Sequence, residues 1–283
     1  MCFLISRHYS TPKYPDIIGM QNYKGKKMHS HFYRNPKDYE NFKNVVVLGF
    51  GPSGKDIALE LSAVCEKVTI CHSRDRTKSK LPGNCFEKYS IHHIAGNGDF
   101  VTSSDDVISD VDLFIMCTGY HYDFPFIGDD VDLKMSLRTM HSLYKHIFYI
   151  DKPSLSFVGI PWAIVPFPVM HQQAGYIAAV LGGLTSLPSV EEMHADTCEE
   201  IEQRLAIPEP AHFFHKMPYK QFQYCDMLAS LSGLPKNPPI IEKLFRYVLQ
   251  FFVTDIMFYK KMEYRRISDD EFEIVKDIVE CRD

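Results

Sequence analysis

One glycine loop, with an apolar run before it and a helical pattern after it, constrains the fold of this chain more than any other feature. Residues 49–54 read GFGPSG, which has the spacing G-x-G-x-x-G. The run VVVL at 45–48 is short, β-branched and apolar, as in a buried strand. Residues 56–65 carry apolar side chains at 57, 58, 61 and 64, on one face of a helix. The order strand, loop, helix predicts a βαβ unit that binds a dinucleotide.

Each glycine of the loop has a physical role in that interpretation. The first permits a tight turn, the second lets the backbone approach a pyrophosphate, and the third lets the helix pack on the strand. The first N–H groups of the helix have no partner within the helix, and its dipole places a partial positive charge there. The alternative interpretation is a glycine-rich turn with a structural role alone.

The same segment almost matches a second kind of phosphate loop. Residues 49–55 also fit G-x-x-x-x-G-K, but a P-loop then needs Ser or Thr for Mg²⁺, and Asp56 stands there. Pro52 would also remove one of the N–H groups that cradle the phosphates. The sequence therefore disfavours an ATPase.

The end of the second predicted strand, 68–71, bears on the choice of nucleotide. An enzyme that uses NAD places an Asp or Glu there for the ribose hydroxyl. Here the strand runs into His72, Ser73 and Arg74, and three further basic residues follow at 76, 78 and 80. Because Arg suits a 2′-phosphate, this pattern favours NADP over NAD. Asp75 disagrees with this hypothesis, and a solvated run of charges is the alternative.

The composition of the chain argues against several classes of partner and function. Lys and Arg total 31 against 36 Asp and Glu, a net charge of -5, which argues against nucleic acid as a partner. The apolar stretch 244–259 is interrupted by Arg246, Gln250 and Asp255, so we expect no transmembrane anchor. The 8 cysteines form no C-x-x-C pair, which disfavours a disulfide reductase and indicates a cytoplasmic protein.

The rest of the chain predicts an α/β fold. We expect strands at 111–117 and 155–160, and at most a short hairpin within 74–110. Residues 1–44 and 161–168 are interrupted by prolines and predict irregular structure. Helices are predicted over 169–184, from a capping box at Ser189 and Glu192 to about 206, near 218–231, and over 240–262. The histidines at 92, 93, 212 and 215 lack partners at metal-ligand spacing, so we expect no metal.

Three segments in order resemble the flavin-containing monooxygenases, in particular those of animals such as insects. Residues 23–33 resemble the identifying motif F-x-G-x-x-x-H-x-x-x-[YF], with Tyr23 in place of Phe and with His29 and Tyr33 matching. Residues 45–58, VVVLGFGPSGKDIA, are similar to the NADPH-binding loop of the family. Residues 117–120, CTGY, continue into DFPFI at 123–127 and resemble a further family motif. The likeness extends over nearly the whole chain.

The resemblance implies a function. Members are flavoprotein oxidoreductases of xenobiotic metabolism, similar to N,N-dimethylaniline monooxygenase. Their FAD is reduced by NADPH, reacts with O₂ and passes one oxygen atom to a soft nitrogen or sulfur of a small molecule. The cofactor performs this chemistry, which fits the lack of a recognisable triad in this sequence. The expected partners are thus NADP(H), FAD, O₂ and an amine or sulfide, and a homo-oligomer remains open.

The resemblance also assigns residues, while it leaves the catalytic residues unknown. Ser73 and Arg74 would hold the 2′-phosphate. Thr118 and Gly119 would return the chain to the flavin domain, and Gln173 would lie near the flavin. The pyrophosphate of NADP would be held by the loop residues Gly49, Gly51, Pro52, Ser53 and Gly54.

The chain departs from the family in one large respect. The family has two dinucleotide loops with the FAD loop first, whereas one loop is present here and 44 residues precede its strand. A βαβ unit takes roughly 30 residues or more, and no fingerprint lies in that stretch. We therefore expect an incomplete FAD-binding domain, and three functions stay open. These are an FAD- and NADPH-dependent monooxygenase, a truncated non-catalytic NADP-binding fragment of one, and a plain NADP-dependent dehydrogenase without a flavin.

The expected architecture is a Rossmann-like, doubly wound NADP-binding domain inserted in this incomplete FAD-binding domain, with an α-helical C-terminal segment. Residues 1–38 would be the remnant of the FAD domain and a linker, and 39–116 the NADP-binding domain. Residues 117–235 would complete the FAD domain, and 236–283 would be a helical extension. The expected location is cytoplasmic, with attachment to the periphery of the endoplasmic reticulum as a second option.

Overall fold

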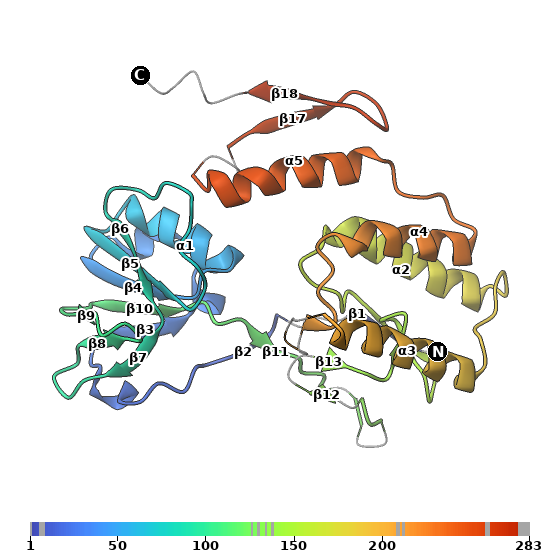
Figure 1. Cartoon of the computed structure of the whole chain (residues 1–283), viewed down its shortest axis with the longest axis horizontal. Helices are drawn as coiled ribbons and strands as arrows, with labels where there is room; N and C mark the ends of the chain where they lie inside the picture. The colour runs from blue at the N-terminus through green and yellow to red at the C-terminus, as the bar shows by residue number, and fades with distance from the viewer. Residues whose placement is uncertain are drawn as a thin grey trace. The chain divides into compact units, whose positions relative to one another are not determined.

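The computed structural model describes residues 2–5, 9–125, 127–128, 131–133, 135–136, 139–207, 210, 213–257 and 261–276, and of residues 2–5, 136 and 276 the backbone alone. The chain forms two compact units (Figure 1). Unit 1 comprises 1–11, 121–245 and 268–271, and unit 2 comprises 12–120, 246–267 and 272–283. The first two segments that pass from one unit to the other form a short two-stranded sheet of β2 (Thr11–Pro12) and β11 (Tyr120–His121).

Unit 2 is built on a parallel sheet with the strand order β3-β10-β4-β5-β6. The chain runs outward from β4 to β5 and β6 and then returns past β4 to β10, so the strand order reverses between β4 and β10. The strands are β3 (Lys26–His29), β4 (Asn44–Leu48), β5 (Lys67–His72), β6 (Cys85–Tyr89) and β10 (Leu113–Met116).

Both faces of this sheet are covered, which explains why β4 is a continuous apolar run. Val45 and Val47 pack beneath α1 (Pro52–Ser62), together with Leu61. Val46 and Leu48 face the other way, into a cluster that contains Phe100. That second face is covered by an antiparallel sheet of β7 (Ile91–Ile94), β8 (Phe100–Thr102) and β9 (Val107–Ile108).

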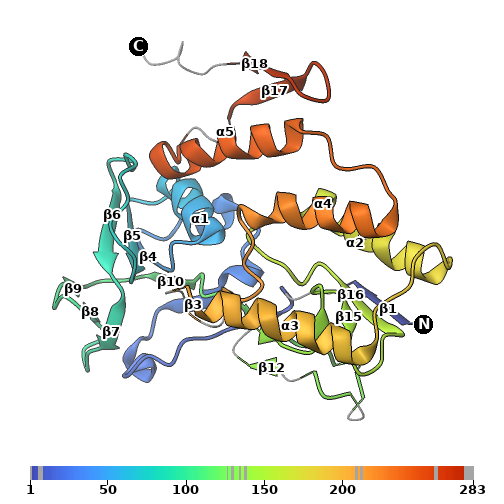
Figure 2. The same ribbon diagram turned by 45° about the vertical axis from the view of Figure 1, so that its right-hand side comes forward.

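Unit 1 combines a sheet of order β1-β16-β15-β14 with three helices. β1 (Cys2–Ile5) pairs parallel with β16 (Leu155–Val158), and β14 (Leu143–Tyr144) forms a hairpin with β15 (Phe148–Tyr149). A small hairpin of β12 (Met135–Ser136) and β13 (Thr139–Met140) belongs to the same unit. The helices are α2 (Pro166–Leu181), α3 (Val190–Leu205) and α4 (Lys220–Ser232), and α2 lies beside α4 (Figure 2).

The C-terminal part of the chain contributes to both units. Helix α5 (Ile240–Thr254) has its first residues in unit 1 and its last in unit 2. Just beyond it, Ile256 lies in the core beneath α1, and its N–H donates to Oγ of Ser79 at 2.9 Å. The hairpin of β17 (Glu263–Arg266) and β18 (Phe272–Lys276) follows.

The predicted α/β class, the four predicted strands and the capping box at Ser189 are confirmed. Helix α2 begins at Pro166, earlier than predicted, because proline is tolerated in the first helical turn, where its missing N–H would have had no partner within the helix. Each helix in the described part of the chain is too short or too polar to cross a membrane.

Three expectations were wrong. Residues 1–44 are not an irregular linker throughout, because 26–29 form β3 at the edge of the parallel sheet, where exposed lysines are tolerated. Residues 74–110 hold β6 and a three-stranded sheet rather than at most a hairpin. The segment 236–283 is not helical throughout, because the helix predicted to 262 ends at Thr254 and the hairpin of β17 and β18 follows. Three short 3₁₀ turns also lie in the N-terminal stretch: Met20–Asn22, Ser30–Phe32 and Pro36–Tyr39.

Candidate functional site

Three loops of unit 2 meet at the carboxyl edge of the parallel sheet. Leu48, the last residue of β4, is in register with Cys71 of β5 and Met116 of β10. The N–H of Gly49 donates to the carbonyl oxygen of Cys71 at 2.8 Å, and that of Cys117 donates to Leu48 at 2.7 Å. The loops 49–54, 72–77 and 117–120 therefore start side by side. This is also the position where the strand order reverses, where α/β sheets bind their ligands.

The three glycines of the loop differ in what surrounds them. Gly49 has a φ of +110°, and a Cβ on it would lie 2.5 Å from the carbonyl oxygen of Cys117. A Cβ on Gly54 would lie 2.0 Å from the carbonyl oxygen of Gly49. A Cβ on Gly51 would meet no described atom within 4 Å. The first and third glycines are thus required by backbone packing, whereas the second faces open space.

Helix α1 presents its N-terminus to that space. Gly51 is the N-cap, and no side chain within α1 caps the helix or places an acidic group in its first turn. Pro52 occupies the first turn, and both it and Ser53 are exposed. The free N–H groups and the helix dipole make this end of α1 attractive to an anion.

Lys55 does not serve this loop as the lysine of a P-loop would. Its side chain is buried, and its Nζ donates to the carbonyl oxygen of Phe252 at 3.2 Å. The ammonium group also lies 3.9 Å from the centre of the Phe252 ring and 4.9 Å from that of Phe50. Burial, and then the nearby Arg74, lower its pKa. Its ammonium group is thus occupied by contacts to Phe252 and Phe50.

Ser73 and Arg74 follow the end of β5, and both are exposed. The preceding residue, His72, is buried and stacks on Phe50 of the glycine loop, with ring centres 4.8 Å apart and planes at 8°. His72 also contacts Glu87 of β6 at 2.6 Å. The two exposed residues could be predicted from the sequence, whereas the pair of His72 and Glu87 could not, because nothing in the sequence brings position 87 next to position 72.

His29 joins two of the motifs. It is buried, and its Nδ1 accepts the N–H of His31 at 3.0 Å, so its Nε2 carries the proton and donates to the carbonyl oxygen of Gly119 at 2.9 Å. Burial lowers its pKa. Thr118 donates from Oγ1 to the carbonyl oxygen of Lys13 at 2.5 Å. Thr118 and Gly119 therefore fix the place where the chain enters and leaves unit 2.

Gln173 lies in unit 1 with both ends of its amide occupied. Its Oε1 accepts the N–H of Gly159 at 2.8 Å, and its Nε2 donates to the hydroxyl of Tyr224 at 2.8 Å. That hydroxyl donates to the carbonyl oxygen of Lys145 at 2.8 Å. Gln173 is fully buried. Its Oε1 holds the backbone of Gly159, which follows β16 and has a φ of +87°. Its predicted position near a flavin stays a prediction.

A buried chain of hydrogen bonds in unit 1 includes His215, one of the histidines that the sequence shows without partners at metal-ligand spacing. Nε2 of His215 accepts the N–H of Met140 at 3.0 Å, so its Nδ1 donates to Nδ1 of His146 at 2.8 Å. His146 then donates from Nε2 to Glu200 at 2.9 Å. The turn that carries Lys145 and His146 has positive φ at both residues, 51° and 57°. Neither this set nor any other group of described residues could hold a metal ion.

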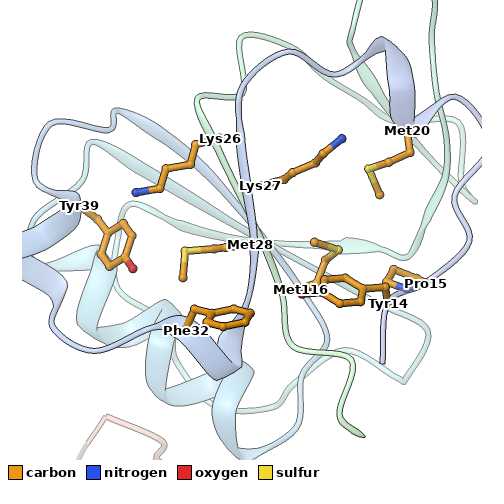
Figure 3. A pocket seen from close by; sticks show the side chains of 9 residues that line it. All are labelled: Tyr14, Pro15, Met20, Lys26, Lys27, Met28, Phe32, Tyr39 and Met116. Atoms are coloured by element: carbon orange, nitrogen blue, oxygen red, sulfur yellow. The ribbon is translucent and has the colours of Figure 1, made fainter. Parts of the chain in front are cut away.

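Two cavities lie away from the glycine loop. One, of about 490 Å³ in unit 2, surrounds the edge strand β3, from which Lys26 and Lys27 extend in opposite directions (Figure 3). The other, of about 450 Å³ in unit 1, lies beside His146 and Glu200. No residue predicted to bind the nucleotide lines either cavity.

The surroundings of the glycines predict opposite outcomes for two matched substitutions. Gly54→Ala forces backbone apart at Gly49, and we expect it to lower the free energy of unfolding of unit 2 by about 2 kcal/mol or more. Gly51→Ala is expected to cost less than about 1 kcal/mol, mainly through a weaker N-cap. Urea unfolding followed by circular dichroism measures both. Equal losses would contradict the packing described for Gly54.

Glu200 predicts an acid-sensitive contribution to stability. Burial alone would raise its pKa, but His146, Lys145 and Lys220 together hold the pKa below the ordinary value of 4.5. A carboxyl group with a lowered pKa stabilises the fold above its unfolded pKa, and this stability is lost as the pH falls through its folded pKa. Because Glu200 is partly exposed, we expect Glu200→Gln to cost only about 1 kcal/mol at pH 7.

The measurement is urea unfolding of both proteins at pH 7 and at pH 3.5. The difference between the wild-type chain and Glu200→Gln should shrink at the lower pH. A difference that stays the same at both values would show that the charge of Glu200 does not contribute.

Comparison with known proteins places the chain in a family. A profile described as flavin-binding monooxygenase-like matches residues 2–78 and 75–250. Senecionine N-oxygenase of Tyria jacobaeae is 31% identical over 277 residues, which are 94% of this chain and 59% of that protein. Flavin-containing monooxygenase FMO GS-OX-like 2 of Arabidopsis thaliana is 34% identical over 244 residues, which are 84% of this chain and 52% of that protein.

Solved structures agree with this result. S-allyl-L-cysteine S-oxygenase from Allium sativum superposes with a TM-score of 0.84 at 32% identity, over 96% of this chain and 60% of that chain. Tmm from Pelagibacter sp. strain HTCC7211 gives a TM-score of 0.82 at 26% identity, over 97% and 61%. The chain thus spans between about half and three fifths of the length of these proteins. By its sequence and its fold, the chain belongs to the flavin-binding monooxygenase-like family, oxidoreductases whose cofactors are FAD and NADPH.

Proposed function

We propose that unit 2 binds NADP(H) at the carboxyl edge of its parallel sheet, as part of an FAD- and NADPH-dependent monooxygenase. One observation carries this proposal: the open space at Gly51, between two glycines that backbone packing requires, faces the uncapped N-terminus of α1. A pyrophosphate fits such a place, because its oxygens replace the missing N–H partners and no side chain blocks its approach. The role of pyrophosphate ligands falls to Gly49, Gly51, Pro52, Ser53 and Gly54.

Ser73 and Arg74 complete the nucleotide site in this proposal. They are exposed and follow β5, whose end lies beside the start of the glycine loop. A guanidinium group at this position pairs with a 2′-phosphate through charge-assisted hydrogen bonds, whereas a ribose hydroxyl offers it much less. We therefore infer a preference for NADP over NAD.

Fewer residues of this chain are proposed to bind FAD than are proposed to bind NADP. Thr118, Gly119 and Gln173 are the residues proposed for the flavin side, and the amide of Gln173 can act there only by holding Gly159. The sequence contains one G-x-G-x-x-G loop, which the proposal assigns to NADP. When bound, FAD supplies the reaction with O₂, and NADPH supplies the reducing equivalents. The residues of this chain bind and orient the nucleotides, and they keep the loops that meet them fixed.

The names of the relatives suggest a class of substrate for this chain. Their names describe an N-oxygenase and an S-oxygenase, so we infer a small molecule with a soft nitrogen or sulfur, an amine or a sulfide, that receives one atom of O₂. We further propose that unit 2 is the NADP-binding domain, predicted as 39–116, and that unit 1 holds the FAD-domain part predicted as 117–235. The homo-oligomer and the cytoplasmic location also stay predictions.

A second function is a non-catalytic NADP-binding chain. The single dinucleotide loop of the sequence favours it, because the proposal assigns that loop to NADP. The two functions differ in whether this chain retains FAD.

The 2′-phosphate assignment predicts a selective loss of binding. Arg74→Ala should weaken NADP⁺ binding about 10- to 100-fold and NAD⁺ binding less than about threefold, as expected for the loss of a charged hydrogen bond worth about 1.5–3 kcal/mol. Isothermal titration calorimetry of the 283-residue chain measures both.

Arg76→Ala is the matched control, because it removes the same charge from the same loop. The Arg76 guanidinium lies over the ring of Tyr89, 4.5 Å from its centre, and is not assigned to the phosphate. Equal losses for the two dinucleotides, or equal losses in the two variants, would contradict the role of Arg74.

Retention of FAD decides between the two functions. The purified chain is incubated with FAD, desalted, and examined by its visible absorption spectrum. A retained flavin band supports the monooxygenase, and the next measurement is then turnover with NADPH, O₂ and an amine or thioether. A folded chain that binds NADP⁺ without a flavin band supports the NADP-binding chain.

A further inference from the structure

His72 and Glu87 form a buried pair behind the loop that carries Arg74. Nε2 of His72 lies 2.6 Å from Oε1 of Glu87, and the two side chains are 3% and 10% exposed. They come from adjacent parallel strands, in which Ile70 is aligned with Glu87 and His72 with Tyr89. The histidine and the carboxylate are therefore diagonal neighbours on one face of the sheet.

The hydrogen bonds fix which nitrogen of His72 carries the proton. The backbone N–H of Arg74 donates to Nδ1 of His72 at 3.1 Å, so Nδ1 is an acceptor and has no proton. The proton is then on Nε2, which donates to Glu87. Glu87 thus selects the tautomer of His72 that can accept the N–H of Arg74.

Glu87 also holds the far end of the same loop. The N–H of Thr77 donates to both carboxylate oxygens, at 2.9 and 3.2 Å. Residues 72–77 are therefore tied at both ends to one carboxylate, and Ser73 and Arg74 are among the exposed residues between the ties. A loop anchored in this way holds Arg74 with less loss of conformational entropy on binding.

The ring of His72 connects this loop to the glycine loop. It stacks on Phe50, which stands between Gly49 and Gly51 and is itself buried. The ammonium group of Lys55, in α1, lies over the ring of Phe50. It also interacts electrostatically with Glu87 and Arg74. His72 is thus in contact with both proposed phosphate-binding loops and, being neutral in this tautomer, adds no charge to either.

We propose that His72 is a positioning residue for NADP, which fixes the backbone of Arg74 through Nδ1 and thereby sets the preference for NADP over NAD, with Glu87 holding its tautomer. This inference rests on the proposed function and adds a residue that acts through Arg74. Two acidic residues belong to this region. Asp75, next to Arg74, is exposed, whereas Glu87 is 10% exposed and contacts His72 behind the loop.

Two substitutions of His72 separate this role from simple packing. In His72→Asn the side-chain oxygen takes the place of Nδ1 and can still accept the N–H of Arg74, as in an Asx turn, while the contact to Glu87 is lost. In His72→Gln the amide nitrogen takes the place of Nε2 and can still donate to Glu87, while the acceptor for Arg74 is lost. Both remove the imidazole ring from Phe50.

The test measures NADP⁺ and NAD⁺ binding by calorimetry in the full chain. We expect His72→Asn to keep NADP⁺ affinity within about threefold of the wild-type chain, and His72→Gln to lose about five- to tenfold for NADP⁺ with little change for NAD⁺, the effect of one neutral hydrogen bond. Equal losses in the two variants would overturn the proposal in favour of packing, and no loss in either would overturn it outright.

A second pair keeps the test decisive if the His72 variants fail to fold. Glu87→Gln retains an oxygen that accepts from His72 and Thr77, whereas Glu87→Ala removes it. We expect Glu87→Ala to reduce NADP⁺ affinity about five- to tenfold and Glu87→Gln to reduce it less than about threefold. Circular dichroism confirms folding, and unchanged NADP⁺ affinity in folded Glu87→Ala would contradict the proposal.

The Arg74→Ala variant distinguishes a failure of the inference about His72 from a failure of the proposed function. If Arg74→Ala abolishes the preference for NADP⁺ while His72→Gln leaves it intact, the proposed function stands and the inference about His72 is wrong. If the wild-type chain binds neither dinucleotide, or Arg74→Ala weakens both equally, both are wrong.

Discussion

The close approach of the glycine loop to the end of β10 is the constraint on which unit 2 depends. The backbone at Gly49 passes so near Cys117, and that at Gly54 so near Gly49, that a single Cβ would collide with a carbonyl oxygen in either place. This approach lets α1 pack on the sheet and begin at its carboxyl edge. The loops that follow β5 and β10 then lie beside it, so one contact between backbones brings the three segments of the candidate site together.

Buried histidines fix several loops of this molecule by one shared arrangement. In His29, His72 and His215 one ring nitrogen accepts a backbone N–H, which leaves the proton on the other nitrogen. That second nitrogen donates to a carbonyl oxygen, a carboxylate or another imidazole. Such a ring is neutral and has both nitrogens satisfied, so it can be buried at little cost. The arrangement ties a strand end to a neighbouring segment at each place.

The sequence predicted the centre of unit 2 and missed its periphery. β4, α1, β5 and β10 carry apolar runs and a glycine spacing that few other structures tolerate, so local patterns were sufficient. β3 and β6 were missed because an edge strand or a half-covered strand accepts Lys26, Lys27 and Glu87. Ser73 and Arg74 could be named from their position after a strand. The contact from Glu87 could not be predicted, because it depends on which strands become neighbours, and no local sequence pattern gives the strand order.

The end of α5 and the residues just beyond it make unit 2 discontinuous in sequence. Phe252 covers Lys55 of α1, and Ile256 fills the core beneath the same helix, nearly two hundred residues along the chain from the glycine loop. An excised segment 12–120 would contain the complete fingerprint and the complete parallel sheet. It would also leave the ammonium group of Lys55 uncovered and the place of Ile256 in the core beneath α1 unfilled. Boundaries for expressing this unit are therefore set by its packing and must include the C-terminal segment.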